Sequence, residues 1–110
     1  MPDDEGHPDQ AELSLGSVLP ALADPLRRRV VRELVLSDEG AVRTCAWFNL
    51  PVSKATLTHH FRVLREAGLI RQINRGNSRA ATLRRSDLQA KFPGLLDLLA
   101  QEAEEARIDD

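Results

Sequence analysis

The 110-residue sequence contains no tyrosine and one cysteine, and only 4% of its residues are aromatic. A single cysteine excludes an intrachain disulfide, so we expect the reducing cytoplasm as the compartment. No stretch approaches the roughly 20 apolar residues that a membrane span needs, and the acidic, polar N-terminus predicts no signal peptide. The sequence also lacks Gly-x-Ser-x-Gly, a P-loop and a cysteine–histidine pair at catalytic spacing. We therefore expect neither an enzyme nor a bound cofactor.

The net charge of −2 gives by itself no indication of a nucleic-acid partner. The charge is unevenly distributed along the chain, however. Residues 43–91 carry ten basic and two acidic side chains, a net charge of +8, whereas residues 1–26 carry six acids and no Lys or Arg. Residues 92–110 add six acids and one arginine. A basic middle between acidic ends predicts a surface for an acidic partner such as nucleic acid.

The spacing of apolar residues predicts a single domain over residues 13–106, between an acidic, disordered tail at 1–12 and a short tail at 107–110. Caps and stop signals predict helices at 13–23, 25–38, 41–49 and 53–68, and a last, interrupted helix from residue 86 onward. Two short strand candidates, 69–75 and 79–85, are joined by a turn that contains Gly and Asn. The predicted fold class is therefore mainly α with a β-hairpin, in the order α-α-α-α-β-β-α.

The clearest helix begins at Ser53 and ends at Gly68. At 100° per residue, one side forms a buried stripe of Leu57, Phe61, Leu64 and Gly68. The opposite face presents Ala55, Thr58, His59 and Arg62, with Lys54 and Arg65 on its flank. A helix that enters the major groove offers such groups to bases and phosphates from its first turns. The alternative for this helix alone is a solvated amphipathic helix.

The segments on either side of this helix favour the DNA-binding interpretation. A short helix and a tight turn precede it, which makes a helix-turn-helix. The hairpin that follows contains five arginines, more than ordinary solubility requires: Arg71, Arg75, Arg79, Arg84 and Arg85. A wing that lies along phosphates or enters a minor groove uses arginine in this way.

Two motifs, in this order, resemble the ArsR-type (arsenic-repressor-like) bacterial winged-helix transcriptional regulators. The segment ALADPLRRRVVREL (21–34) is similar to the family's second helix, and VSKATLTHHFRVLREAGLI (52–70) is similar to its recognition helix. The hairpin with Gly76 matches the wing, and the resemblance covers roughly residues 13–100. It implies a homodimer that binds an inverted-repeat operator in double-stranded DNA and releases it when an effector, a small molecule or a redox signal, is present.

The resemblance also implies the residues of the site. Positions that match the family's operator contacts are Lys54, Ala55, Thr56, Thr58, His59 and Arg62 on the helix, and Arg75 and Arg79 on the wing. Thr56 lies near the flank of the buried stripe, and we interpret His60 as mainly structural. The first and last helices would form the dimer interface, because their leucines and valine exceed what one small core needs: Leu15, Val18, Leu19, Leu22, Leu95, Leu96, Leu98 and Leu99. The alternative is that both helices pack only on their own domain.

We expect no metal site, although many members of this family sense metals. Cys45 has no second cysteine to form a thiolate pair, and the last helical region, 86–106, contains no histidine. We interpret Cys45 as a small buried apolar residue. A redox or electrophile switch is the alternative, and it would require a lowered pKa of the thiol.

The sequence thus predicts a dimeric, cytoplasmic, sequence-specific DNA-binding regulator, a repressor of its own or a neighbouring operon. The alternative from another class is a winged-helix protein–protein interaction module without DNA-binding activity, with the acidic ends as its working surface. The run Glu102, Glu104 and Glu105 is interpreted as a solvated helix end.

Overall fold

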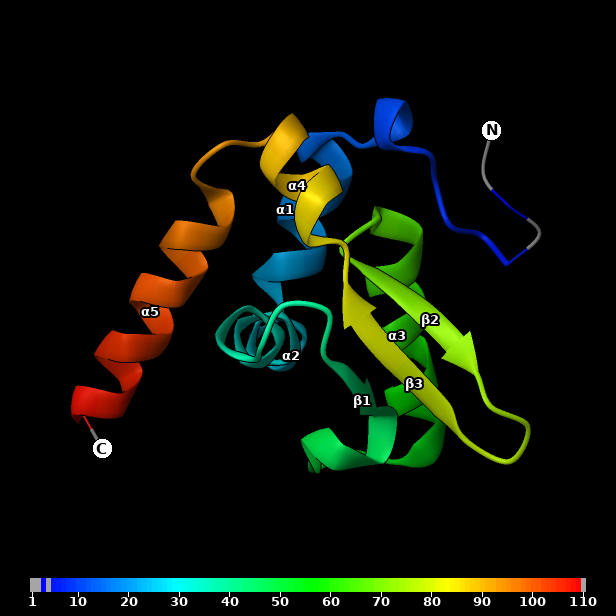
Figure 1. The fold of residues 1–110 in the computed structure, drawn as a ribbon. Helices are drawn as coiled ribbons and strands as arrows, with labels where there is room; N and C mark the ends of the chain where they lie inside the picture. The colour runs from blue at the N-terminus through cyan, green and yellow to red at the C-terminus, as the bar shows by residue number, and fades with distance from the viewer. Residues whose placement is uncertain (1–2, 4, 110) are drawn as a thin grey trace.

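The computed structural model describes residues 3 and 5–109; residues 1, 2, 4 and 110, which belong to the predicted tails, lie outside the described residues. Three α-helices precede the hairpin and two follow it (Figure 1). The helices are α1 (Leu15–Ala23), α2 (Pro25–Leu36), α3 (Lys54–Ala67), α4 (Arg85–Lys91) and α5 (Leu95–Asp109), with short 3-10 helices η1 (Gln10–Glu12) and η2 (Cys45–Phe48). The strands are β1 (Val42–Thr44), β2 (Ile70–Asn74) and β3 (Arg79–Leu83). This is a winged helix-turn-helix, as the sequence predicts.

Local capping residues determine where the central helices begin and end. The Asp24 carboxylate accepts hydrogen bonds from the backbone N–H groups of Leu26 and Arg27, both at 3.0 Å, and Pro25 occupies the first helical position of α2. Ser53 Oγ accepts from the Thr56 N–H at 3.2 Å at the start of α3. Gly68 ends α3 with a φ of +85°, a left-handed conformation that favours glycine. The predicted boundaries of α3 are confirmed.

The three strands form an antiparallel sheet in the order β1-β3-β2. The predicted hairpin is β2 and β3, with Asn74 opposite Arg79 beside the turn. The helix predicted over 41–49 is wrong: Val42–Thr44 is a strand paired with β3, and only Cys45–Phe48 is helical, as a 3-10 turn. Its partner residues, such as Thr82 opposite Val42, lie about forty positions away, so local propensity could not indicate the pairing.

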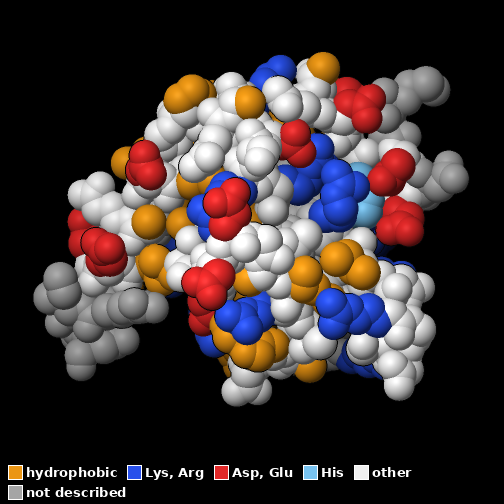
Figure 2. Space-filling model, viewed as in Figure 1, with side chains coloured by type: hydrophobic (Ala, Val, Ile, Leu, Met, Phe, Trp, Pro, Cys, Tyr) orange, Lys and Arg blue, Asp and Glu red, His pale blue; other side chains and the backbone are white. Residues whose placement is uncertain are grey.

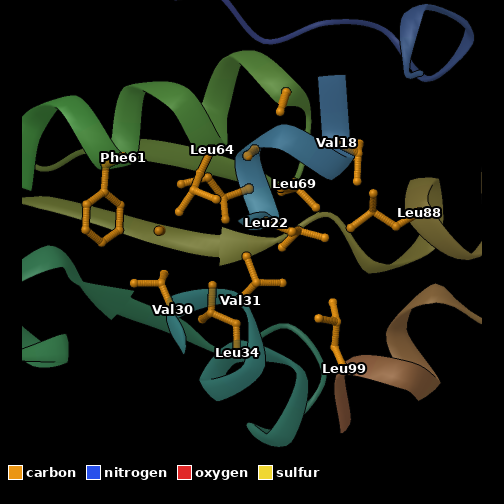
Figure 3. Packing of buried hydrophobic residues seen from close by; sticks show 14 of the residues in the cluster. Val18, Leu22, Val30, Val31, Leu34, Phe61, Leu64, Leu69, Leu88 and Leu99 are labelled. Atoms are coloured by element: carbon orange, nitrogen blue, oxygen red, sulfur yellow. The ribbon is translucent and has the colours of Figure 1, made fainter. Parts of the chain in front are cut away.

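The core lies between α2, α3 and the sheet. Val30 and Val31 of α2 and Phe61 and Leu64 of α3 are almost completely buried and belong to one hydrophobic cluster, which Figure 3 shows from close by. Ala80 and Ala81 on the central strand β3 are both fully buried, and Ala81 belongs to the same core cluster as the buried side chains of α2 and α3. Its small side chain fits the close packing of that cluster.

The N-terminal segment has a defined place in the described residues, in contrast to the disorder expected over 1–12. Residues 5–9 run beside α3 and β2 before the chain reaches η1 (Figure 1). Leu13 is 3% exposed and lies against the α-carbon of Gly68. At the other end, α5 extends through residues 107–109, which were assigned to the predicted C-terminal tail.

Within the described part of the chain, no helix is long and apolar enough to cross a membrane.

Candidate nucleic-acid interface

The N-terminal half of α3 presents its polar face to solvent. Lys54, Ala55, Thr58, His59 and Arg62 are all exposed, as the helical wheel predicts. Thr56 is also exposed, and its hydroxyl oxygen accepts a hydrogen bond from Ser53 Oγ at 3.1 Å, so it supports the helix cap. The face therefore offers hydroxyl, imidazole and cationic groups on one helix surface.

The hairpin carries two further exposed cations at its tip, Arg75 and Arg79. The Arg75 N–H donates to the Ser78 carbonyl at 2.8 Å, and the Gly76 N–H donates to Asn74 Oδ1 at 3.0 Å. Gly76 has a φ of +81°, which the tight turn requires. The turn chemistry thus holds the two arginines on either side of the tip, at the same end of the molecule as the start of α3 (Figure 1).

A cleft of about 600 Å³ separates the start of α3 from the hairpin. Lys54 and Thr58 line its helix wall, whereas Asn74, Ser78 and Arg79 line its hairpin wall. Cationic, hydroxyl and amide groups on facing walls are the donors that contact a phosphodiester backbone. Asn74 and Ser78 were not predicted as contacts, although Ser78 lies in the predicted turn and Asn74 lies near the end of the strand before it.

The cations of this interface have no ion-pair partner among the residues that the structure describes. Among the described residues, no acidic group lies within 4.0 Å of the charged nitrogens of Lys54, Arg62, Arg75 or Arg79. Basic side chains also lie over the outer half of the hairpin in Figure 2, apart from the acids that gather elsewhere on that face. These four cations remain available to an acidic ligand.

Three of the five hairpin arginines have other roles. Arg84 is 6% exposed, and its guanidinium contacts Asp87 at 3.0 Å and the Pro8 carbonyl at 2.6 Å. Arg85 donates to the carbonyl of Val35 on α2 at 3.2 Å. Arg71 is exposed, with a guanidinium nitrogen 3.9 Å from the Asp3 carboxylate. The assignment of Arg84 and Arg85 to the wing is wrong, because both lie where the chain turns into α4 and are used to join α4 to the core.

His60, next to the exposed face, is structural. Its ring is 7% exposed, and its Nδ1 accepts from the Arg27 guanidinium at 3.3 Å. Burial lowers the pKa of His60, opposed by the Asp24 carboxylate. The ring therefore remains neutral and ties α3 to α2, which positions the exposed residues of α3.

Cys45 lies half-buried on the inner wall of the cleft. Burial raises the pKa of its thiol, and the neighbouring Gln72 and Arg79 only partly oppose this effect. A thiol whose charged form is disfavoured is a poor nucleophile. Among the described residues, no three or more His, Cys, Asp or Glu side chains are grouped so that they could hold a metal ion.

The eight predicted dimerisation residues divide into two groups. Val18, Leu22, Leu96 and Leu99 belong to the protomer's own core, and Leu95 packs against that core as a half-buried side chain. Leu15 and Leu19 on α1 are 49% and 53% exposed, and Leu98 on α5 is 65% exposed. Of the eight, only these three have exposed side chains in the protomer.

Glu102 was interpreted as part of a solvated helix end, and this is wrong. Its carboxylate accepts from Arg28 Nε at 2.9 Å and from Arg32 Nη1 at 2.6 Å, so it joins α5 to α2. These two hydrogen bonds, that from Arg32 first, lower the pKa of Glu102. Leu98 lies one turn before Glu102 on α5 and is 65% exposed.

The fold, the exposed α3 face and the basic wing together define a winged-helix DNA-binding protein. No protein-family model matches the chain. It is 31% identical over 82 residues to an uncharacterized HTH-type transcriptional regulator, YceK, of Bacillus subtilis (strain 168), covering 74% of this chain and 82% of that protein.

Two crystal structures have the same fold. An ArsR family transcriptional regulator has a TM-score of 0.60 at 22% identity, covering 91% of this chain and 96% of its own. A possible transcriptional regulator for arsenical resistance has a TM-score of 0.56 at 29% identity, covering 84% of this chain and 94% of its own. The chain belongs to the HTH-type transcriptional regulators, and it has the fold of an ArsR family structure.

Proposed function

We propose that this protein is a repressor that binds an inverted-repeat operator as a homodimer. The observation that carries the proposal is the shared position of two DNA-reading elements. The start of α3 and the hairpin tip lie at one end of the domain, and their four cations have no acidic partner in the described chain. In the proposed complex, α3 reads base edges in the major groove and the wing contacts the adjacent backbone and minor groove.

Five residues have assigned roles in this complex. Thr58 and His59 face the bases, because they occupy the exposed first two turns of α3. Arg62, one turn further on, contacts a phosphate. Lys54 and Arg79 line the facing walls of the cleft, where they bind the strand that passes between the two grooves.

The dimer interface is assigned to the uncovered leucines of α1 and α5. Leu15, Leu19 and Leu98 are each about half exposed or more, which is costly for large apolar side chains of a small domain. A two-fold interface through these helices would set two α3 helices roughly 34 Å apart, so that they read half-sites about one DNA turn apart.

The test of DNA binding is selection from a random duplex library, followed by affinity measurements over a range of salt concentrations. Loss of Thr58 and His59 is expected to remove sequence preference, by about 1–3 kcal/mol per lost base contact. Lys54→Ala is expected to weaken binding to all duplexes and to reduce the salt slope of the dimer by about two units, about one for each protomer. Lys91→Ala is the matched control, because Lys91 is exposed on α4 at the opposite end of the domain and should leave binding unchanged.

A protein–protein interaction module is the second candidate, and the acidic residues at both ends of the sequence favour it. The two candidates differ in one measurement. If the wild-type protein shows no salt-dependent affinity for any duplex, the interaction module is the correct function.

The homodimer is tested separately by sedimentation at micromolar concentration. We expect a dimer for the wild type and a folded monomer for Leu98→Glu, which adds a charge to the proposed interface without disturbing the core. A wild-type monomer under these conditions would exclude the two-fold operator. The proposed site of action is the cytoplasm, and footprinting in the presence of metals, oxidants and small molecules tests for the effector.

A further inference from the structure

The N-terminal segment contacts the hairpin at the outer edge of the sheet. Strand β2 pairs only with β3 in this sheet, so N–H groups on its other edge need partners from elsewhere. The Gln72 N–H donates to His7 Nε2 at 2.9 Å. Both residues are buried, with His7 4% and Gln72 7% exposed. A buried histidine therefore satisfies a buried backbone donor of the wing.

This contact is one link in a longer polar chain. Gln72 Oε1 accepts from Arg65 Nη1 on α3 at 2.6 Å, and His7 Nδ1 lies 2.9 Å from the Asp3 carboxylate. Acidic and basic side chains meet on the surface where the N-terminal segment lies against β2 (Figure 2). Gln72 thus connects the recognition helix, through its side chain, to the N-terminal segment, through its backbone.

Gln72 stands close to the proposed DNA contacts on both elements. Two residues after it, Asn74 is paired with Arg79 and lines the cleft. Arg65 lies on the same helix as Thr58 and Arg62. A shift of β2 at Gln72 would therefore move the wing relative to the recognition helix.

We propose that His7 is a positioning residue that holds the wing in its DNA-binding position, and that protonation of its ring releases the wing and weakens DNA binding. The first part describes a contact within the protein. The second part rests on the proposed function, because it needs the wing to bind DNA.

The partners of the two ring nitrogens define the protonation state. A backbone N–H can only donate, so Nε2 must carry a lone pair, and the Asp3 carboxylate at Nδ1 requires a proton there. The ring in the contact is therefore neutral. A proton taken up from solvent adds N–H at Nε2, which then faces the Gln72 N–H, and the hydrogen bond is lost. The pair with Asp3 survives, but both of its members lie on the N-terminal segment, so it does not hold that segment to the sheet.

Charged groups of both signs surround the ring. Arg71 on β2 lies beside Asp3, Arg65 and Glu66 of α3 lie beside Gly6, and Arg84 holds the Pro8 carbonyl with Asp87 as its partner. The carboxylates near the ring are Asp3, Glu5, Glu66 and Asp87. Histidine is the side chain that ordinarily changes charge between about pH 5 and about pH 8, so the proposal is tested across this range.

The contact itself is tested by amide hydrogen exchange, corrected for the chemical exchange rate, without DNA. The Gln72 amide is expected to be protected at about pH 8 and to lose at least about tenfold of that protection at about pH 5.5. In His7→Gln, whose carboxamide oxygen can accept at either pH, protection should be equal at both. The Leu57 amide, bonded to the Ser53 carbonyl at 2.9 Å, is the control and should not change. Equal protection of Gln72 at both pH values in the wild type would overturn the proposal.

The consequence for DNA binding is tested with the duplex recovered by selection. Between about pH 8 and about pH 5.5, the affinity of the wild type is expected to fall about five- to tenfold relative to that of His7→Gln, since one hydrogen bond is lost. His59 is present in both proteins, so any contribution from this residue cancels in the ratio. His7→Leu should bind weakly at both pH values, with circular dichroism as the check that it is folded.

The two experiments separate the two proposals. If the wild type binds no duplex, the proposed function fails, but the Gln72 exchange still decides whether the His7 contact opens with pH. If exchange changes as expected and the affinity ratio does not, the contact exists but His7 does not position the wing.

Discussion

Gly68 provides a sharp test of the packing between the N-terminal segment and the recognition helix. It ends α3 at a φ of +85°, and a methyl group added to its α-carbon would overlap Leu13 Cδ2 and lie 3.2 Å from Pro8 Cγ. Gly68→Ala therefore has two effects, a strained backbone and a steric clash. Gly40 has almost the same φ, +80°, with no atom within 4 Å of the added group, so Gly40→Ala has only the first.

The two effects have different magnitudes. The left-handed conformation costs a non-glycine residue roughly 1–2 kcal/mol, and the lower entropy of the unfolded alanine chain offsets about 0.4–1 kcal/mol of this. Gly40→Ala should therefore lower the free energy of unfolding by about 1 kcal/mol or less. In Gly68→Ala, Leu13 must also leave its buried position, and overpacking of this kind costs about 1–3 kcal/mol more. The expected total is about 2–4 kcal/mol.

Urea unfolding followed by circular dichroism measures both values, at one protein concentration because dimerisation stabilises the folded state. Equal destabilisation by Gly40→Ala and Gly68→Ala would refute the packing of Leu13 on Gly68. A double-mutant cycle gives a second check. Leu13→Ala removes the clashing side chain, so Gly68→Ala should cost about 1–3 kcal/mol less in that background than in the wild type.

Three further predictions concern titratable side chains. Glu102→Gln should lower the free energy of unfolding by about 0.5–1 kcal/mol, a small value because the Glu102 side chain is 43% exposed. Since the pKa of Glu102 is lowered in the folded state, its stabilisation is present above the ordinary glutamate pKa and disappears as the pH falls through the folded-state value. Glu104→Gln is the control, because Glu104 is exposed. Burial lowers the pKa of His60, so wild-type stability should decrease as pH falls below about 6.5, where the unfolded ring is protonated first, and this slope should be smaller in His60→Asn. Cys45 should react with iodoacetamide at neutral pH much more slowly in the folded than in the urea-unfolded protein, because burial raises the pKa of its thiol; rapid native labelling with loss of DNA binding would restore the redox-switch interpretation.

Elements with local end signals could be predicted from the sequence. Ser53 and Gly68 bound a strongly amphipathic α3, and the Gly–Asn turn at 76–77 joins two segments of matching length. Each signal depends on residues within one helix or one hairpin. The same is true of the exposed face of α3, since side-chain direction follows from helical periodicity alone.

Features that depend on distant partners could not be predicted in this way. Strand β1 exists because Val42–Thr44 pair with β3, and nothing within residues 41–49 indicates that pairing. His7 stands in an acidic, polar segment that has the composition of a disordered tail, and its burial depends on an unpaired N–H of β2, 65 positions away. The leucines of α1 and α5 are equally apolar in the sequence, so their burial could not be predicted one by one. The packing of α5 on α2 determines that Leu99 is buried and Leu98 is exposed.

Tertiary contacts also determine which of the ten cations of residues 43–91 can bind DNA. Their number sets the expected salt dependence of DNA affinity. Six of them have internal neighbours or lie away from the interface: Arg43 stacks on Trp47 at 4.6 Å, Arg65 binds Gln72, Arg71 lies beside Asp3, Arg84 and Arg85 bind within the fold, and Lys91 is on α4. The four at the interface give about eight phosphate contacts for a dimer. The slope of log K against log salt concentration is then about −7, whereas all ten cations per protomer would give about −18. A slope near −7 for the wild-type dimer, which becomes less negative by about two in Lys54→Ala, would support this assignment of charges. A slope near −18 would contradict it.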